Sequence, residues 1–218
     1  MRITLTFDNG PTPGATEAIL DVLDAYGLRA SFFVIGRRLQ DPEGRRATER
    51  AHAEGHWIGN HTFSHEIPLG RDKRPDHVEK EITSVDRLLG SLAHQSRYFR
   101  PHGKGKLGPH VLSFAAYQYL IENKSTLVTW NNVPEDWLAP RLEWKRRAFQ
   151  KMEKLSWSVL VLHDPHLADM LSTLPEFLDE ALSAGYEFVQ DFPAECTPIL
   201  RGEAQRPLQD LVTDFERA

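Results

Sequence analysis

The amino-acid sequence predicts an α/β protein built on a parallel β-sheet. Its 218 residues, 40% apolar and 26% charged, have the composition of a soluble globular protein with one large core. Segments with the two-residue period of a strand alternate with segments of helical period along the whole chain. Strands separated by helices form βαβ units, so we expect a parallel sheet, either open or closed into a barrel.

About seven segments are expected to be strands. In the first of them Ile3, Leu5 and Phe7 lie on one side, alternating with polar residues, and residues 31–35 are a short apolar run typical of a buried strand. The predicted strands are residues 2–7, 31–35, 57–59, 97–100, 126–130, 158–163 and 186–189.

Helices are expected between these strands. Residues 16–26 place Ile19, Leu20 and Leu23 at helical spacing, and Gly27 supplies a C-terminal stop. The same period predicts further helices over residues 47–54, 76–92, 111–122, 141–154 and 170–184.

We expect a single domain over residues 1–218, because no linker, repeat or low-complexity segment divides the chain. Near the end of the chain, Leu208, Leu211, Val212 and Phe215 recur at helical spacing. This pattern predicts a C-terminal helical tail over about residues 201–218. The tail would pack on the outside of the domain or on a partner, so the sequence leaves open whether the protein forms a homo-oligomer.

Composition excludes several classes of protein. The net charge of -5, from 26 basic and 31 acidic residues, argues against a nucleic-acid partner. The single cysteine, Cys196, has no internal disulfide partner, and no apolar run reaches the ~20 residues that span a bilayer. The N-terminus enters a strand pattern without a basic and apolar leader, so we expect a cytoplasmic protein with no membrane partner.

Chemically active side chains follow successive predicted strands. In parallel α/β folds the carboxyl ends of the strands meet at one edge, where chemistry gathers, so these side chains are expected to lie together. In chain order they are Asp8 and Asn9, His61 and His65, Arg100 with His102 and Gly103, Asp136 and Trp137, and His163.

Each of these signals also has an ordinary structural explanation. Asp8-Asn9-Gly10 suits a turn, His163 suits a buried core position, and Arg100 suits an ion pair with any carboxylate. His61 and His65 are four residues apart, so on one helical turn they could bind one metal ion, although two loop histidines are the commoner case. Their joint occurrence at strand ends favours a functional site.

These motifs resemble those of the polysaccharide deacetylases, carbohydrate esterase family four, which act on chitin, chitooligosaccharides, peptidoglycan and xylan. Residues 6–11, T-F-D-N-G-P, match the family's T-F-D-D-G-P at five of six positions, and residues 61–65 meet H-[ST]-x-x-H in full. The resemblance extends from residue 2 to about residue 189.

The remaining three motifs of the family are met less completely. Arg100 fits R-x-P-[FY], but His102 and Gly103 replace the proline and the aromatic residue. The D-x-x-D-W motif keeps Asp136 and Trp137, with Val133 in place of its first aspartate. The last motif, a leucine-containing strand that ends in histidine, is met by V-L-H at residues 161–163.

The resemblance implies a distorted parallel (β/α) barrel and a role for each matching residue. It makes Asp8 the general base, His163 the general acid and Arg100 the residue that orients the base, with Asp136 holding that arginine. The implied ligands of one divalent metal ion, with zinc the expected ion, are Asn9, His61 and His65.

These roles suit hydrolysis of an acetamide by water. Asp8 takes a proton from water, and His163 protonates the departing amine, because an imidazole titrates near neutral pH. Backbone N–H groups between Arg100 and Gly103 are expected to support the oxyanion. Leu162 and Trp137 are expected to line a small pocket for the acetyl methyl group.

Asn9 is the main departure from the family pattern, because an amide oxygen is a weaker metal ligand than a carboxylate. We therefore consider three functions. The first is a metal-dependent N-deacetylase for a small soluble substrate, an N-acetylated amino sugar or a short chitooligosaccharide. The second is an amidohydrolase for a small cyclic amide or ureide, working with or without a metal. The third is a catalytically silent carbohydrate-binding relative.

Overall fold

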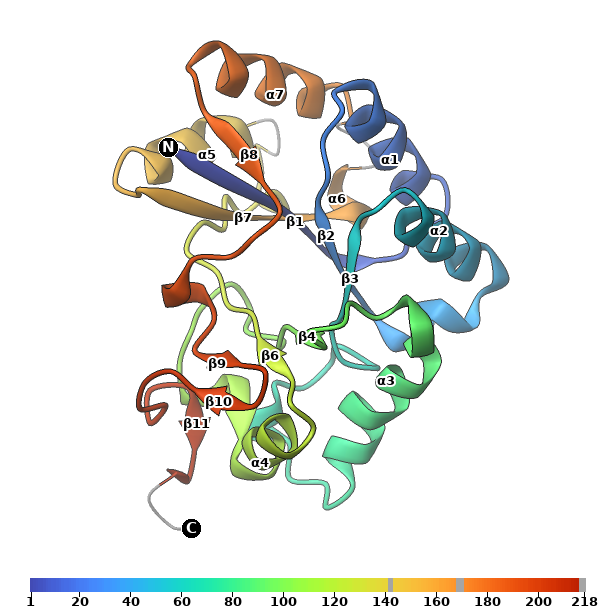
Figure 1. Ribbon diagram of the computed structural model, residues 1–218, viewed down its shortest axis with the longest axis vertical. Coiled ribbons are helices and arrows are strands. Elements are labelled where there is room, and N and C mark those ends of the chain that lie inside the picture. The colour runs from blue at the N-terminus through green and yellow to red at the C-terminus, as the bar shows by residue number, and fades with distance from the viewer. Residues whose placement is uncertain (141–142, 168–170, 216–218) are drawn as a thin grey trace.

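The computed structural model of the protein describes residues 1–140, 143–167 and 171–215. It is a mixed α/β fold in which a mostly parallel sheet curls into a partial barrel, with the helices around the outside (Figure 1). This arrangement confirms the predicted fold class. Among the described residues, no helix has the length and apolar character needed to cross a bilayer.

All of the predicted strands are present, most of them within one or two residues of the expected bounds. They are β1 Arg2–Gly10, β2 Ser31–Val34, β3 Trp57–Asn60, β4 Tyr98–Phe99, β6 Thr126–Leu127, β7 Trp157–His163 and β8 Glu187–Val189. Four two-residue strands escaped prediction because they are too short to show a period. These are β5 Leu112–Ser113, β9 Ile199–Leu200, β10 Glu203–Ala204 and β11 Val212–Thr213.

The sheet curls because β1 pairs with β2, β7 and β8, and because the chain beyond β6 returns to β7. The described strands run in the order β10-β9-β6-β4-β3-β2-β1-β7, and β8 pairs with the first residues of β1, at Arg2–Thr4. Beyond β6, the backbone of Asn132 pairs in parallel with Leu160 of β7, and Val161 N donates to its carbonyl at 2.9 Å. The two sides of the sheet are thereby brought together around the carboxyl ends of the strands.

The helices agree with the prediction in position but differ in detail. Helix α2 begins at Pro42 instead of residue 47, because Asp41 caps it through the N–H of Glu43. The predicted helix 76–92 is divided into a π-helical turn Glu79–Thr83, helix α3 Ser84–Leu89 and a 3₁₀ turn Gly90–Leu92. The others are α1 Ala15–Ala25, α4 Phe114–Glu122, α5 Trp144–Met152, α6 Asp164–Leu167 and α7 Thr173–Ser183. Residues 141, 142 and 170 of the predicted helices lie outside the described residues.

The prediction of a C-terminal helical tail is wrong for residues 201–215. That segment forms β10, β11 and turns, and residues 216–218 lie outside the described residues. Pro207 lacks the N–H that a continuous helix needs. Leu208, Leu211 and Val212 are instead buried in a core cluster, where β11 pairs with β5.

Helix α7 allows a direct test of the packing of the larger core. Leu178 is fully buried in that core, whereas Leu182, one turn later on the same helix, is 45% exposed. We expect Leu178→Ala to lower the free energy of unfolding by about 2–5 kcal/mol, because the cavity adds to the lost burial. The matched Leu182→Ala should change it by no more than about 0.5 kcal/mol in urea denaturation. Equal losses in the two variants would contradict this packing.

Candidate active site

A pocket of about 230 Å³ opens at the carboxyl ends of the parallel strands. It gathers most of the residues that the sequence singled out, together with several that it did not. Its lining residues are Asp8, Asn9, His61, His65, Pro101, His102, Gly103, Lys104, Gly105, Trp130, Val133, Trp137, Val161, His163 and His166. Arg100 and Asp136 lie directly behind this wall, both with no exposed surface.

Asp8 and Asn9 both reach the pocket because β1 is irregular at its end. Consecutive residues of a regular strand point to opposite faces of the sheet. Here the pairing with β2 shifts between Asp8 and Gly10, and Asn9 has a left-handed φ of 68°. A bulge of this kind re-aims side chains. The irregularity therefore places two neighbouring polar residues on one side.

Asp8 is held by Arg100 as predicted. Arg100 Nη1 donates to Asp8 Oδ1 at 2.7 Å, and Asp8 itself is only 4% exposed. The other carboxylate oxygen, Oδ2, is 3.6 Å from His61 Nε2. Asp8 thus has one oxygen fixed and the other directed toward the histidines.

The two histidines of the H-x-x-x-H motif present neutral rings to the pocket. His61 Nδ1 lies 2.8 Å from the carbonyl oxygen of Arg100, which can only accept, so Nδ1 carries the proton and Nε2 keeps its lone pair. The His65 ring lies 4.8 Å from the His61 ring, centre to centre. Burial lowers the pKa of His61 well below its usual value and that of His65 to about 2. Neutral imidazole is the form that binds metals.

Asn9 completes a donor set that fits a divalent ion. Its Oδ1 atom is buried and has no hydrogen-bond partner among the described residues, which is costly for an amide oxygen unless something else binds it. The described residues contain no group of three or more His, Cys, Asp or Glu side chains placed to hold a metal. The predicted set contains two histidines and one amide. An ion bound by these neutral donors alone would keep its full charge toward the pocket.

Asp136 does not hold Arg100, contrary to the prediction. Its two carboxylate oxygens accept from His163, Oδ1 from the ring Nδ1 at 2.7 Å and Oδ2 from the backbone N–H at 2.9 Å. The partners of Arg100 are instead Thr6, Asp8 and the carbonyls of Val128 and Thr129. The loop that follows β6 carries Asp136 toward β7, where His163 ends the strand.

The environment of His163 suits a proton donor. Burial disfavours its imidazolium, but the nearby carboxylates, led by Asp136, outweigh burial and raise the pKa above its usual value. With Nδ1 engaged by Asp136, Nε2 is the ring nitrogen left to the pocket. Trp137 packs edge-on against this ring, with centres 5.1 Å apart.

The prediction that Leu162 lines the substrate pocket is wrong. Leu162 is fully buried in the larger core, while Val161 lines the pocket. Residues two apart in a strand share a face, so the residue that accompanies His163 is Val161. Strand periodicity counted back from the histidine gives this assignment.

Gly103 and Trp137 line the pocket as predicted. A Cβ at Gly103 would lie 2.5 Å from the Trp130 ring, so only glycine allows that ring to close the wall. In the segment from Arg100 to Gly103, the backbone N–H of Arg100 donates to the carbonyl oxygen of Asn60, and Pro101 has no backbone N–H. The oxyanion donors available in this loop are therefore the N–H groups of His102 and Gly103.

Three ionisable residues of the pocket were given no role from the sequence. Lys104 follows Gly103 in a polar loop and carried no distinguishing pattern. His102 was noted only as a departure from a motif, yet its ring stacks on His65 with centres 3.8 Å apart. His166 lies one helical turn beyond His163 on α6, and this H-x-x-H spacing is a signal that could have identified it.

The donor set can be tested through Asn9. The variant Asn9→Asp keeps the shape of the side chain and adds a negative charge, so we expect it to bind Zn²⁺ at least about tenfold more tightly, or ~1.4 kcal/mol. Competition with a chelator at fixed pH measures this affinity. His61→Ala should abolish stoichiometric binding. If Asn9→Asp leaves the affinity unchanged or weaker, Asn9 is not a ligand.

Comparisons with known proteins agree with these motifs. The profile of the polysaccharide deacetylase family matches residues 1–115. The chain is 31% identical over 192 residues to the peptidoglycan-N-acetylglucosamine deacetylase of Bacillus cereus, covering 86% of this chain and 84% of that enzyme. It is 34% identical over 146 residues to a chitooligosaccharide deacetylase of Azorhizobium caulinodans, covering 65% of this chain and 63% of that enzyme.

The fold comparison gives the same result. A family 4 acetyl xylan esterase from Clostridium thermocellum, solved with a cobalt ion, superposes with a TM-score of 0.66 at 28% identity and 87% coverage of each chain. The two sequence relatives above are named as deacetylases, so the expectation of a deacetylase-type hydrolase is confirmed. The chain belongs to the polysaccharide deacetylase family.

Proposed function

We propose that this protein is a metal-dependent N-deacetylase that hydrolyses the acetamide of N-acetylated amino sugars or short chitooligosaccharides. One observation carries the proposal. On the wall of a single pocket, a carboxylate paired with a buried arginine and a histidine paired with a buried aspartate flank the candidate metal ligands. Amide hydrolysis by water needs one group that accepts a proton and another that donates one.

Asp8 serves as the general base. Arg100 occupies Oδ1, so Oδ2 is the oxygen available to take a proton from the attacking water. The guanidinium fixes the orientation of the carboxylate before the substrate arrives. Arg100 therefore acts through Asp8.

His163 serves as the general acid. Its raised pKa keeps a protonated fraction available near neutral pH, and Nε2 delivers that proton to the departing amine. Asp136 holds both the ring and the backbone of His163, so the tautomer and the orientation are set together. In this role Asp136 belongs to the acid and not to the base.

Asn9, His61 and His65 would hold the divalent ion, for which zinc is the expected identity. When bound, such an ion supplies a Lewis acid for the amide carbonyl and acidifies water. The N–H groups of His102 and Gly103 are placed to support the oxyanion. Val161, Val133 and Trp137 offer an apolar wall for the acetyl methyl group.

The substrate class follows from the pocket and from the relatives. A cavity of about 230 Å³ is smaller than the ~300–1,000 Å³ of drug-sized ligand sites, so it encloses one sugar unit at a time. The two sequence relatives are named for peptidoglycan N-acetylglucosamine and for chitooligosaccharide, which share an N-acetylated amino sugar. The amidohydrolase function is not favoured, because those relatives are deacetylases.

The acid–base assignment predicts a direction of change with pH. The acid must be protonated, so turnover should fall as pH rises through the pKa of His163. Asp136→Asn removes the carboxylate that does most to raise this pKa, so the basic limb of the kcat profile should move to lower pH. Asp24→Asn, the same change on the exposed face of α1, should leave the profile in place. A basic limb unchanged in Asp136→Asn would remove His163 from the role of acid.

Acetate release provides the test of the function itself. Wild-type protein loaded with Zn²⁺ is expected to release acetate from N-acetylglucosamine oligomers, and Asp8→Asn and His163→Ala should each be at least ~100-fold slower. Circular dichroism should confirm that each variant is folded, because Asp8→Asn leaves Arg100 buried without its ion-pair partner. Binding of the oligomers without release of acetate would instead support the silent carbohydrate-binding function.

A further inference from the structure

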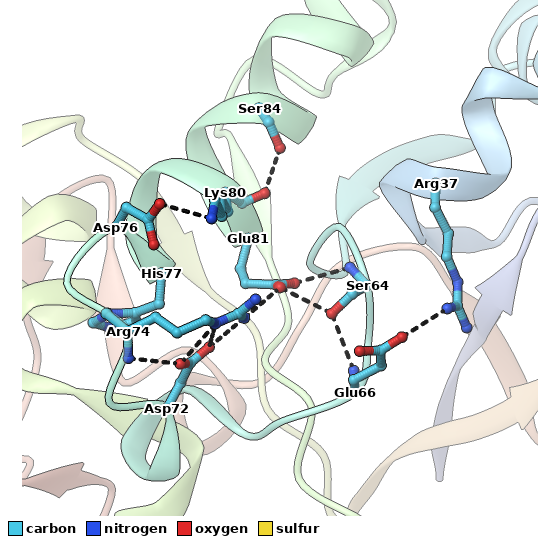
Figure 2. A network of polar contacts seen from close by, with 10 residues as sticks. All are labelled: Arg37, Ser64, Glu66, Asp72, Arg74, Asp76, His77, Lys80, Glu81 and Ser84. Carbon is cyan, nitrogen blue, oxygen red and sulfur yellow. Dashed lines mark hydrogen bonds and ion pairs between the residues drawn. The ribbon is translucent and has the colours of Figure 1, made fainter.

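A buried glutamate outside the pocket is bonded to the loop that carries the two histidines. Glu81 is 3% exposed and lies in the π-helical turn Glu79–Thr83. Its Oε2 accepts from the backbone N–H of Ser64 at 2.9 Å, and its Oε1 accepts from the Ser64 hydroxyl at 2.8 Å. Figure 2 shows Glu81 reaching toward Ser64 with Arg74 and Asp72 on its other side. Ser64 is the residue immediately before His65.

The loop between the histidines needs external support, because its backbone is strained. Thr62 and His65 have left-handed φ values of 67° and 57°, which non-glycine residues rarely adopt unless their surroundings impose them. Asn60 Oδ1 accepts from the N–H of Thr62 at 2.9 Å, and the N–H of Gly36 donates to the carbonyl of Thr62 at 2.9 Å. These contacts fix the first half of the loop. The contacts of Glu81 with Ser64 fix the second half.

The two histidines are oriented in different ways. His61 has the support usual for a metal ligand, since its second ring nitrogen donates to the carbonyl of Arg100. His65 is instead placed by ring contacts with His61 and His102 and by its own backbone. Its position therefore depends more on the loop that carries it, and Ser64 is the neighbour that Glu81 holds.

Glu81 is itself anchored on the side away from the loop. Arg74 Nη2 donates to Glu81 Oε1 at 2.9 Å, and the same guanidinium is paired with the buried carboxylate of Asp72. His77 joins this segment to helix α4, with Nδ1 2.7 Å from the carbonyl of Arg74 and Nε2 2.6 Å from the hydroxyl of Ser113. The carboxylate of Glu81 is thus held from both sides (Figure 2).

Stability alone is a weak reason for such an arrangement. The Arg74 side chain is 42% exposed, so its pair with Glu81 is only partly buried and adds little net stability. Charged groups around a buried carboxylate are better attested as a means of selecting one conformation. π-Helical turns of this kind also occur frequently at functional sites. Both observations suit a residue whose task is to fix the geometry of a neighbouring loop.

We propose that Glu81 is a positioning residue for the metal centre, which holds Ser64 so that the strained loop presents His65 beside His61. This inference rests on the proposed function, because it takes the two histidines as ligands. Glu81 acts through Ser64 and touches neither metal nor substrate. Its removal should weaken metal binding in protein that is still folded.

The test measures Zn²⁺ affinity by chelator competition in Glu81→Gln, with the wild type and His61→Ala as references. Loss of a supporting contact around a metal ligand commonly costs 10–100-fold in affinity, so we expect at least about a tenfold loss. The matched control is Glu79→Gln in the same helical turn, where an exposed glutamate pairs with Arg87 at 2.6 Å. That control should keep the wild-type affinity, because exposed ion pairs contribute little.

Two further measurements separate positioning from general destabilisation. Co²⁺ bound to Glu81→Gln should show shifted visible bands relative to Co²⁺ bound to wild type, which a merely less stable protein would not show. Ser64→Ala removes the hydroxyl contacts with Glu81 and with the N–H of Glu66 but keeps the backbone contact with Glu81. It should weaken Zn²⁺ binding by about fivefold, in line with one hydrogen bond. This milder variant keeps the proposal testable if Glu81→Gln fails to fold. The double variant should lose less than the product of the two single losses, because the residues act together.

The outcomes distinguish this inference from the proposed function. If wild type binds Zn²⁺, His61→Ala abolishes binding and folded Glu81→Gln or Ser64→Ala keeps the wild-type affinity, the positioning role is overturned and the metal site stands. If wild type binds no Zn²⁺, or His61→Ala binds it equally well, the metal site and the role of Glu81 are overturned together.

Discussion

The buried guanidinium of Arg100 is the constraint on which the rest of the site depends. It has no exposed surface, lies 3.9 Å over the ring of Phe33, and donates to Thr6 and Asp8 at 2.7 Å. A charge in that position is tolerable only with a close counter-charge and satisfied donors. Asp8 supplies the counter-charge, so the orientation of the proposed base follows from how the barrel interior is filled. The same residue also offers its carbonyl to His61 Nδ1, so one side chain and its backbone connect the base to a candidate metal ligand.

A second pair of opposite charges, Asp136 with His163, raises the pKa of its histidine, whereas the pKa values of His61 and His65 are lowered. Burial lowers the pKa values of His61 and His65, even though Asp8 lies 3.6 Å from His61 Nε2. His163 is also buried, but Asp136 lies against its ring and the pKa rises. The proposed metal ligands His61 and His65 thus have lowered pKa values, and the proposed acid His163 has a raised one. The direct contact of Asp136 with the ring of His163 makes this difference, since the rings themselves are chemically the same.

The fold and the pocket residues were predictable wherever a periodic pattern or a strand end carried the signal. Every predicted strand was found, because buried parallel strands leave apolar runs between turn residues. The partner of Asp136 was not predictable, because it depends on where the loop after β6 meets β7. The C-terminal tail was predicted wrongly as a helix, because its apolar residues recur at helical spacing. Short strands and turns can bury apolar residues at the same spacing. The role of Glu81 could not be predicted from the sequence, because a glutamate within a helical pattern normally faces solvent. Only the packing of the π-helical turn against the histidine loop shows that Glu81 is buried.

The strained residues of the site share one physical explanation. Asn9, Thr62 and His65 all have positive φ values. Asn9 lies at the irregular end of β1, and Thr62 and His65 lie in the loop that follows β3. At both places the chain must turn while still aiming polar side chains into the pocket. A regular strand cannot present adjacent residues on one face, so two neighbouring polar groups at a strand end require a departure from regular backbone. That departure costs free energy, of order 1–3 kcal/mol for each such residue, and persists only where surrounding contacts impose it. The amide of Asn60, the N–H of Gly36 and the carboxylate of Glu81 supply those contacts around the histidine loop. The polar network outside the pocket therefore holds in place the strained backbone that lies beside the pocket.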